Sequence, residues 1–138
     1  MAKMSAKNAV INIDDSTGTP QNVSADCVSF DIKQDAGKNE VTGFGDGTKN
    51  YIPGMPVTEI SFDFLWNSST TSGAQSVLKG IYNSVSSKTV SIKPDTGGLT
   101  LSGEFMLDNL PAAGKPDGNL QLGKVTFSVY GSTAPAWA

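Results

Sequence analysis

The sequence predicts a mainly β fold, an antiparallel β-sandwich or barrel with one flanking α-helix. Two observations predict it: apolar and polar residues alternate along four long stretches, and one segment alone has a helical period. The 138 residues correspond to one domain. We expect this domain to cover residues 1–138, with a flexible N-terminal arm at residues 1–8 and a flexible C-terminal tail at residues 132–138.

Strict alternation locates the strands, because successive side chains of a strand point to opposite faces. The four long stretches each have one apolar and one polar face, and they are residues 28–33, 59–66, 99–107 and 124–130. Shorter strands are expected at residues 9–13, 41–44, 51–52 and 89–92. Turn signals rich in Asp and Gly separate these stretches.

The parity of the apolar positions changes at Cys27. Apolar residues before it are odd-numbered, and from Val28 onward they are even-numbered. A strand that crosses this point needs a bulge or a bend, since a one-residue shift moves every side chain to the other face. We interpret Cys27 as a small core residue and not as a reactive thiol.

One segment changes to a helical period. Apolar residues recur at helical spacing through residues 74–85, which predicts an amphipathic helix of about three turns. Residues 70–72 offer Ser and Thr side chains as N-caps. Gly80 weakens the helix by ~1 kcal/mol relative to Ala. Because such a helix is not stable alone, we expect its apolar stripe to cover an opening in the β structure.

The composition excludes several classes of function. The chain has no His and no Arg, and it has one Cys. It therefore has no Ser-His-Asp triad, no His-ligated metal, no guanidinium clamp and no internal disulfide. The net charge of −3 disfavours a duplex-binding surface. Carboxylates on the polar strand faces have Ser and Thr neighbours that would not raise a pKa. We expect no enzyme, no cofactor and no metal.

Apolar runs near the start of the sequence are short. The run at residues 9–11 is broken by Asn12, whereas a signal peptide needs ~7–15 apolar residues and a membrane span needs ~20. We therefore expect a protein that is made in the cytoplasm and has no membrane partner.

The longest segment without a long predicted strand runs from residue 44 to residue 55. A loop of this length in a compact domain is usually functional or disordered, and its apolar residues favour docking. Its candidate contact residues are Phe44, Asp46, Lys49, Tyr51, Ile52, Pro53 and Met55. Trp137 is a further candidate contact residue, which either packs on a neighbouring molecule or covers its own subunit.

The order of these segments resembles the tail tube proteins of long-tailed bacteriophages. The resemblance covers roughly residues 9–131 and consists of a pattern of strands and turns without an invariant motif. The segments that carry it are residues 41–54, residues 57–66, the single helix, residues 90–95, residues 103–105 and residues 125–131.

The resemblance implies a virion structural protein. Members fold as a β-sandwich-like barrel with one helix, a fold shared with contractile-tail tubes and type VI secretion tubes. Their homohexameric rings stack into a hollow tube that holds a tape measure protein and then conducts phage DNA into the host cell. Tail terminator and tail tip proteins are the expected further partners. The alternatives are a tail terminator, a capsid decoration protein or a secretion-system tube.

The polar strand faces are the natural candidates for the lumen of such a tube. A negative, hydroxyl-rich wall repels DNA and stays hydrated. The lumen-facing candidates are Asp31, Glu59, Ser61, Asp63, Ser102 and Glu104. Lys33 and Lys124 share these polar phases and would make the wall less negative. We also expect edge strands to join neighbouring subunits, and residues 43–55 to reach an adjacent ring or subunit.

Overall fold

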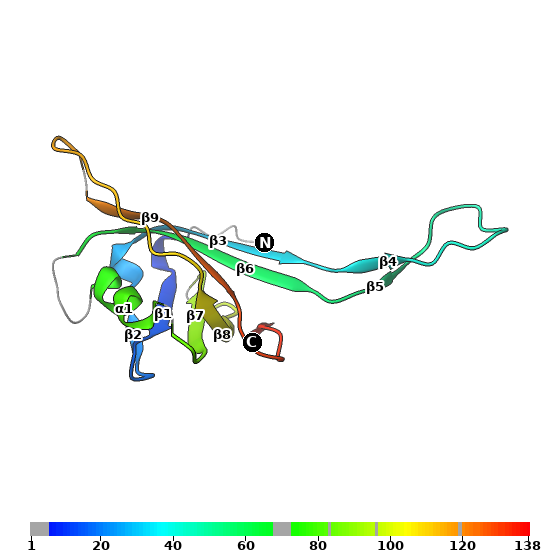
Figure 1. Cartoon of the computed structure of the whole chain (residues 1–138), viewed down its shortest axis with the longest axis horizontal. Coiled ribbons are helices and arrows are strands. Elements are labelled where there is room, and N and C mark those ends of the chain that lie inside the picture. Colours follow the sequence, from blue (N-terminus) through cyan, green and yellow to red (C-terminus); the bar gives the residue numbers. More distant parts are fainter. Residues whose placement is uncertain (1–5, 68–72, 83, 96, 119) are drawn as a thin grey trace.

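The computed structural model describes residues 6–67, 73–82, 84–95, 97–118 and 120–138 (Figure 1). The elements in these ranges, besides 3-10 turns at Ala6–Asn8 and Ser24–Asp26, are β1 (Val10–Asp14), β2 (Pro20–Asn22), β3 (Cys27–Asp35), β4 (Lys38–Glu40), β5 (Tyr51–Pro53), β6 (Val57–Leu65), α1 (Ala74–Ile81), β7 (Lys88–Lys93), β8 (Leu101–Leu107), β9 (Gln121–Val129) and β10 (Ala136–Trp137). The predicted mainly β fold with one flanking helix is confirmed over these residues.

One antiparallel sheet forms the body of the molecule. Its strand order is β2-β1-β7-β8-β9-β6-β3, with β10 paired to β8, while β4 and β5 make a separate two-stranded sheet. The sheet folds over on itself, so that β3, β6 and β9 lie above β1, β7 and β8 in Figure 1. β9 joins the two layers because it pairs with β6 on one side and with β8 on the other.

The apolar phase of every long strand points into the space between the layers. Phe62, Phe64, Phe105 and Phe127 are fully buried there. The Phe62 ring stacks on Phe64, with centroids 5.3 Å apart, and meets Phe127 edge-on at 5.7 Å. These offset and edge-to-face arrangements add to the free energy of burying the rings.

The parity change at Cys27 is a bulge, as predicted. Cys27 lies opposite Phe64, and the next paired residue, Ser29, lies opposite Asp63, so Val28 is the extra residue. The Val28 side chain is exposed. The bulge restores the apolar phase of β3 to the core side, where Phe30 and Ile32 pack against the buried cluster.

Helix α1 covers one end of the space between the layers (Figure 1). Its buried side chains include Val77, Leu78 and Ile81, which join the core cluster. The prediction that the helix continues to residue 85 is wrong: it ends at Ile81, and Val85 is 91 % exposed. The caps expected at residues 70–72 lie outside the described residues.

Gly80 has a packing reason to be glycine. A Cβ at this position would lie 3.3 Å from the Ser16 Cβ in the turn between β1 and β2. The lower helix propensity of glycine is therefore offset by the close approach of α1 to this turn.

The start of α1 receives a carboxylate from a distant part of the chain. The Ala74 backbone N–H donates to Asp26 Oδ2 at 3.1 Å, and Asn67 Nδ2 donates to Asp26 Oδ1 at 3.1 Å. The first amides of a helix have no partner within the helix, and a negative charge there is favourable. Asp26 thus ties the segment before β3 to the helix.

The segment after β3 differs from the sequence prediction. Residues 41–44 are not a strand, whereas β4 (Lys38–Glu40) and β5 (Tyr51–Pro53) pair with each other. The expected loop at residues 44–55 is therefore partly the second strand of a hairpin. We call residues 38–53 the arm, and Figure 1 shows it projecting well beyond the body.

The C-terminal tail, expected to be flexible, is paired within the sheet. β10 continues the line of β9 along β8, with Ala136 opposite Ser102 and Trp137 opposite Leu101. Pro135 is buried. A Cβ on Gly103 would come within 2.8 Å of the Pro135 Cβ, so glycine is needed for this contact.

We predict that Asp26→Ala lowers the free energy of unfolding by about 1 kcal/mol, because the first amide of α1 loses its partner. Urea denaturation followed by circular dichroism would measure the loss. Asp117→Ala, in the exposed turn at residues 115–118, removes the same charge and is the control. Equal losses in both variants would contradict the role assigned to Asp26.

Candidate assembly surfaces

The outward face of β3, β6 and β9 gathers most of the candidate lumen residues. Cross-strand pairing puts side chains of opposite residues on one face. Asp31 lies opposite Ser61, which lies opposite Thr126 on β9. In the next row, Ser29 lies opposite Asp63, and the Ser29 Oγ donates to Asp63 Oδ2 at 2.9 Å. We call this surface the polar face.

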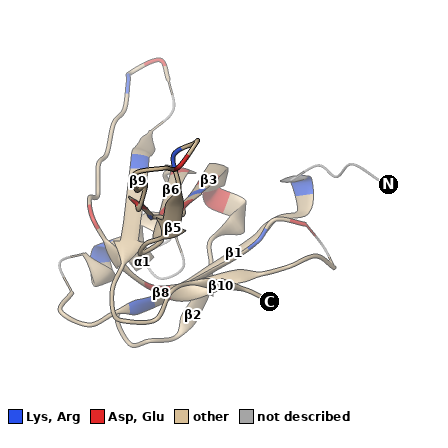
Figure 2. Ribbon diagram, turned by 90° about the vertical axis from the view of Figure 1, so that its right-hand side faces the viewer, with Lys and Arg blue, Asp and Glu red and all other residues tan. Residues whose placement is uncertain are grey.

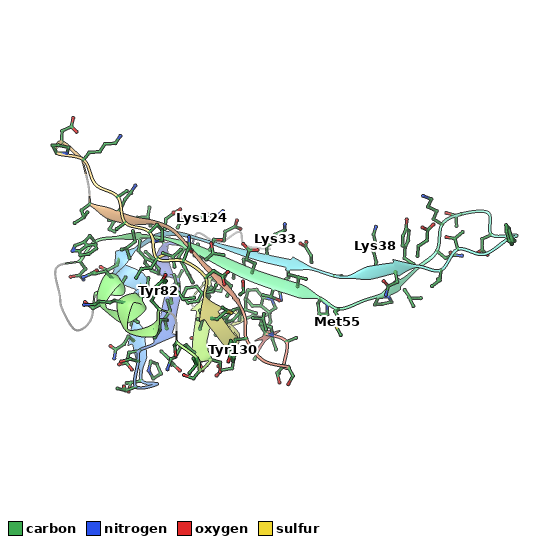
Figure 3. The ribbon with its side chains drawn as sticks, viewed as in Figure 1. Lys33, Lys38, Met55, Tyr82, Lys124 and Tyr130 are labelled. Carbon is green, nitrogen blue, oxygen red and sulfur yellow. The ribbon has the colours of Figure 1, made fainter. Side chains whose placement is uncertain are left out.

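The charges of the polar face largely compensate one another. Lys33 lies opposite Glu59, and Lys124 lies opposite Asp63. Lys33 also makes an ion pair with Asp35 along β3, with Nζ 3.5 Å from Oδ2. Figure 3 shows Lys33 and Lys124 on the side of the sheet that faces away from the core. Both lysines therefore lie on the same face as the carboxylates. The net charge of the polar face is only modestly negative.

Ser102 and Glu104 do not lie with the other four candidates. Both are on β8, in the layer that Figure 2 shows below β9, β6 and β3. The Glu104 carboxylate accepts hydrogen bonds from Ser87 Oγ at 3.2 Å and from Thr89 Oγ1 at 2.5 Å. The structure thus unites Asp31, Glu59, Ser61 and Asp63, and it puts Ser102 and Glu104 on the outer face of the opposite layer.

The arm carries exposed apolar side chains on an ordered hairpin. Phe44 is fully exposed near its tip, and Met55, just after β5, is 89 % exposed. Ile52 and Tyr51 are about half exposed on β5, where the Lys38 Nζ lies 4.5 Å from the centre of the Tyr51 ring.

Hydrogen bonds close the tip of the arm. The Gly43 N–H donates to Asp46 Oδ2 at 2.7 Å, and the Asn50 N–H donates to Thr42 Oγ1 at 2.9 Å. Asp46 therefore has a local structural partner, while Lys49 and Pro53 are exposed. An ordered hairpin that presents uncovered apolar side chains is suited to docking on another protein surface.

The two terminal strands of the main sheet are β2 and β3. β2 has three residues and begins with a proline, which blunts an edge. β3 has nine residues, and its outer edge offers backbone donors and acceptors for a further strand. The long β3 edge is thus the better candidate for strand addition.

Trp137 contacts its own subunit. Its Nε1 donates to the Gln34 Oε1 on β3 at 2.8 Å, and the neighbouring Ala138 exchanges two backbone hydrogen bonds with Thr100. The indole is still 40 % exposed. Trp137 therefore has a contact within its own subunit and keeps an exposed part.

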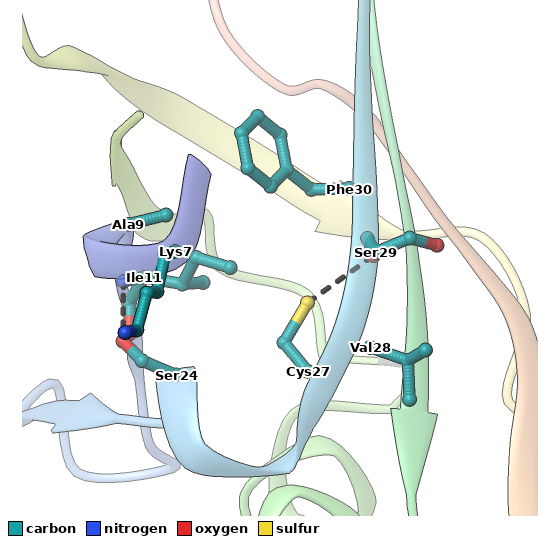
Figure 4. Close-up of a pocket in the computed structure, with 8 residues that line it drawn as sticks. All are labelled: Lys7, Ala9, Ile11, Ser24, Cys27, Val28, Ser29 and Phe30. Carbon is teal, nitrogen blue, oxygen red and sulfur yellow. Dashed lines mark hydrogen bonds between the residues drawn. The ribbon is translucent and has the colours of Figure 1, made fainter. Parts of the chain in front are cut away.

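Cys27 lines a shallow pocket with Lys7, Ile11 and Phe30 (Figure 4). Burial raises the pKa of its thiol to about 11, and the negative charge of Asp63 adds to this. The Cys27 Sγ donates to the Ser29 carbonyl at 3.2 Å. These observations agree with a structural role for Cys27.

Two kinds of feature are absent from the part of the chain that the structure describes. These residues contain no group of three or more His, Cys, Asp or Glu that could hold a metal ion. They also contain no helix that is long and apolar enough to cross a membrane.

Comparison with solved structures relates the fold to components of phage-like tails. A chain in the tail of an empty gene transfer agent particle, refined with C6 symmetry, aligns with a TM-score of 0.80 at 18 % identity over 99 % of each chain. A chain of the native gene transfer agent virion aligns with a TM-score of 0.73 at 16 % identity, again over 99 % of each chain.

A third similar structure comes from an extracellular contractile injection system. A chain of its sheath/tube terminator assembly in the extended state has a TM-score of 0.66 and 14 % identity, covering 100 % of this chain and 98 % of that one. No protein-family model and no curated protein sequence matches the chain. The likeness therefore establishes a tail-tube-like fold.

We predict that Cys27 reacts with a disulfide reagent at pH 8 on the order of 100-fold more slowly than an exposed thiol. The raised pKa keeps the thiol protonated, and the thiolate is the reactive form. The rate should rise as the pH approaches about 11. Thr48→Cys in a Cys27→Ser background provides the exposed thiol on the arm. Similar rates for both thiols would contradict the pKa assignment.

Proposed function

We propose that this chain is a structural protein of a phage-type tail. Its copies form hexameric rings, and the rings stack into a hollow tube that conducts DNA in the virion. The observation that supports this most directly is the agreement of the fold, over 99 % of both chains, with a chain in a gene transfer agent tail of C6 symmetry. The described residues offer surfaces for assembly, which supports a structural role.

Two surfaces supply the contacts that such a tube needs: one is on the body and the other is the arm. A ring requires a heterologous contact that closes, and a filament requires a second contact along its axis. We assign the ring contact to strand addition at the β3 edge. We assign the axial contact to the arm and to Met55 at its base, with Phe44, Ile52 and Met55 as apolar anchors.

We assign the polar face to the lumen. Its mild negative excess and its hydroxyl groups would let DNA slide without adhering to the wall. A tape measure protein would occupy the lumen before DNA does, and tail terminator and tail tip proteins would meet the two ends of the tube. Ser102 and Glu104 would then lie away from the lumen, in the outer layer.

A tail terminator is the second candidate function. The likeness to a chain of a sheath/tube terminator assembly supports it. A terminator would form a closed ring from the same ring contact, but its rings would not stack into an open filament. The two candidates differ in whether the arm makes an axial contact with identical copies.

Electron microscopy of the purified protein over a concentration series tests the proposal. We expect hollow tubes of uniform width above a threshold concentration. Rings that never stack would favour the terminator. A monomer at every concentration, even after addition of tail tip proteins as an initiator, would contradict both candidates.

The same assay tests the arm with Phe44→Ser combined with Met55→Ser. Both side chains lie outside the core, so folding should be unchanged, while the threshold concentration should rise at least about tenfold from the lost apolar burial. Thr48→Ala, a polar change on the same arm, should assemble like the unaltered chain. Tubes of the double variant at the original threshold would show that the arm is not an axial contact.

A charge reversal tests the lumen assignment. Asp31→Lys combined with Asp63→Lys should allow tube assembly but reduce DNA delivery, because the wall would attract the phosphate backbone. Infectivity of particles with the variant tube measures delivery. Asp95→Lys with Asp117→Lys, which lie away from the polar face, provides the same change in net charge. Equal infectivity of the two variants would show that Asp31 and Asp63 do not line the lumen.

A further inference from the structure

The hairpin changes register where the arm leaves the body. The last pair of the body is Asp35 opposite Val57, and the first pair of the arm is Lys38 opposite Pro53. Between these pairs, two residues of one strand face three residues of the other. An extra residue on one strand is the defining feature of a β-bulge, which bends a hairpin and increases its twist. The arm accordingly forms a sheet separate from the main one.

Two glycines meet at this bulge, and we call their meeting point the glycine crossing. The Gly54 N–H donates to the Gly37 carbonyl at 2.6 Å. A Cβ on Gly37 would collide with the Met55 backbone, coming within 2.9 Å of its nitrogen and closer still to its oxygen. A Cβ on Gly54 would lie 3.2 Å from the Gly37 carbonyl carbon.

Close approach of the two backbones explains these glycines. Gly37 and Gly54 are not among the glycines with positive φ, so a left-handed conformation is not the reason for them. The clash on Gly37 involves backbone atoms, which cannot move aside as the end of a flexible side chain can. A substitution here must therefore displace one strand against the other.

A small change at the crossing has a large effect at the tip. The arm extends away from the body beyond this point (Figure 1), and Met55 lies beside the crossing while Lys38 lies just beyond it (Figure 3). From Gly37 to Phe44 an extended chain spans roughly 24 Å. A rotation of about 10° at the crossing would thus displace the tip by about 4 Å, which is enough to unseat an apolar side chain from a packed site.

We propose that the glycine crossing fixes the direction of the arm, and that it thereby positions the two apolar anchors on the arm, Phe44 and Ile52, for their contact with a second copy of this chain. The second part rests on the proposed function. Gly37 and Gly54 are positioning residues, since they act through Phe44 and Ile52, which lie on the arm beyond them. The crossing is a tight backbone contact with its own hydrogen bond, and this distinguishes it from a free hinge.

Spin-label distances test the direction of the arm without requiring assembly. Labels at Lys49→Cys on the arm and Lys79→Cys on α1, in a Cys27→Ser background, report the position of the arm relative to the body. We expect one narrow distance peak for the parent chain and a displaced peak for Gly37→Ala. Gly47→Ala is the matched control, because a Cβ there meets nothing within 4 Å. A broad distribution in the parent chain, or an unchanged peak in Gly37→Ala, would overturn the proposal.

Deletion of Met55 provides a second variant. Without Met55, each strand has two residues between the last pair of the body and the first pair of the arm. The ladder of hydrogen bonds can then continue without the bulge, and the arm should point in a different direction from that in the parent chain. Circular dichroism of both variants should match the parent chain, because the crossing lies outside the core. An unchanged distance peak in this variant would likewise overturn the proposal.

Assembly distinguishes this inference from the proposed function. If the parent chain forms tubes, Gly37→Ala should raise the threshold concentration at least tenfold or change the helical rise and twist of the tube, while Gly47→Ala should do neither. Parent-like tubes from a Gly37→Ala chain with a displaced arm would overturn the link to the contact. If the parent chain does not assemble, the proposed function fails, and the spin-label distances alone still decide whether the crossing fixes the arm.

Discussion

The whole structure depends on burying the apolar face of one continuous sheet. Across the whole sheet, from the edge strand β2 to the opposite edge strand β3, the cross-strand register keeps the apolar side chains on one face. Because the sheet folds over, its two halves bury this face against each other, and Phe62, Phe105 and Phe127 lie in the space between them. The other face must then point outward on both layers, which produces two polar surfaces that face away from each other.

The two open ends of this sandwich have different covers. Helix α1 covers one end, with Asp26 holding its first turn in place. The C-terminal tail covers the other end: Pro135 sits on Gly103, and Trp137 bridges from β8 to Gln34 on β3. The arm leaves the body at this second end (Figure 1), so it is anchored beside a well-packed region while its own apolar residues stay uncovered.

The sequence predicted the features that depend on local pattern. Alternation located the long strands, and parity located the bulge at Cys27. β4 was missed because Lys38, Asn39 and Glu40 have no apolar phase, and its pairing is a property of the hairpin. The helix was extended too far because Tyr82 and Val85 continue the helical period after the chain has turned away from the core.

The placement of the candidate site residues depended on contacts between distant segments. Alternation predicted that Ser102 and Glu104 lie on the same polar face of the sheet as Asp31. The cross-strand register agrees, if the sheet is followed strand by strand as one continuous strip. Alternation could not show that the strip folds over between β8 and β6. The Asp26 cap and the glycine crossing each join residues at least 17 positions apart, so no local pattern in the sequence signals them.

The one-sided sheet also bears on how far such a sequence can diverge. Its packing requires apolar side chains of suitable volume at alternate positions, and cores of this kind accept many different apolar sets when the pattern and the total volume are kept. The outward positions have fewer constraints still, apart from the surfaces that meet other molecules. Selection on the fold therefore acts on the spacing of chemical types more than on individual residues, and lineages can replace most of their amino acids while the backbone keeps its course.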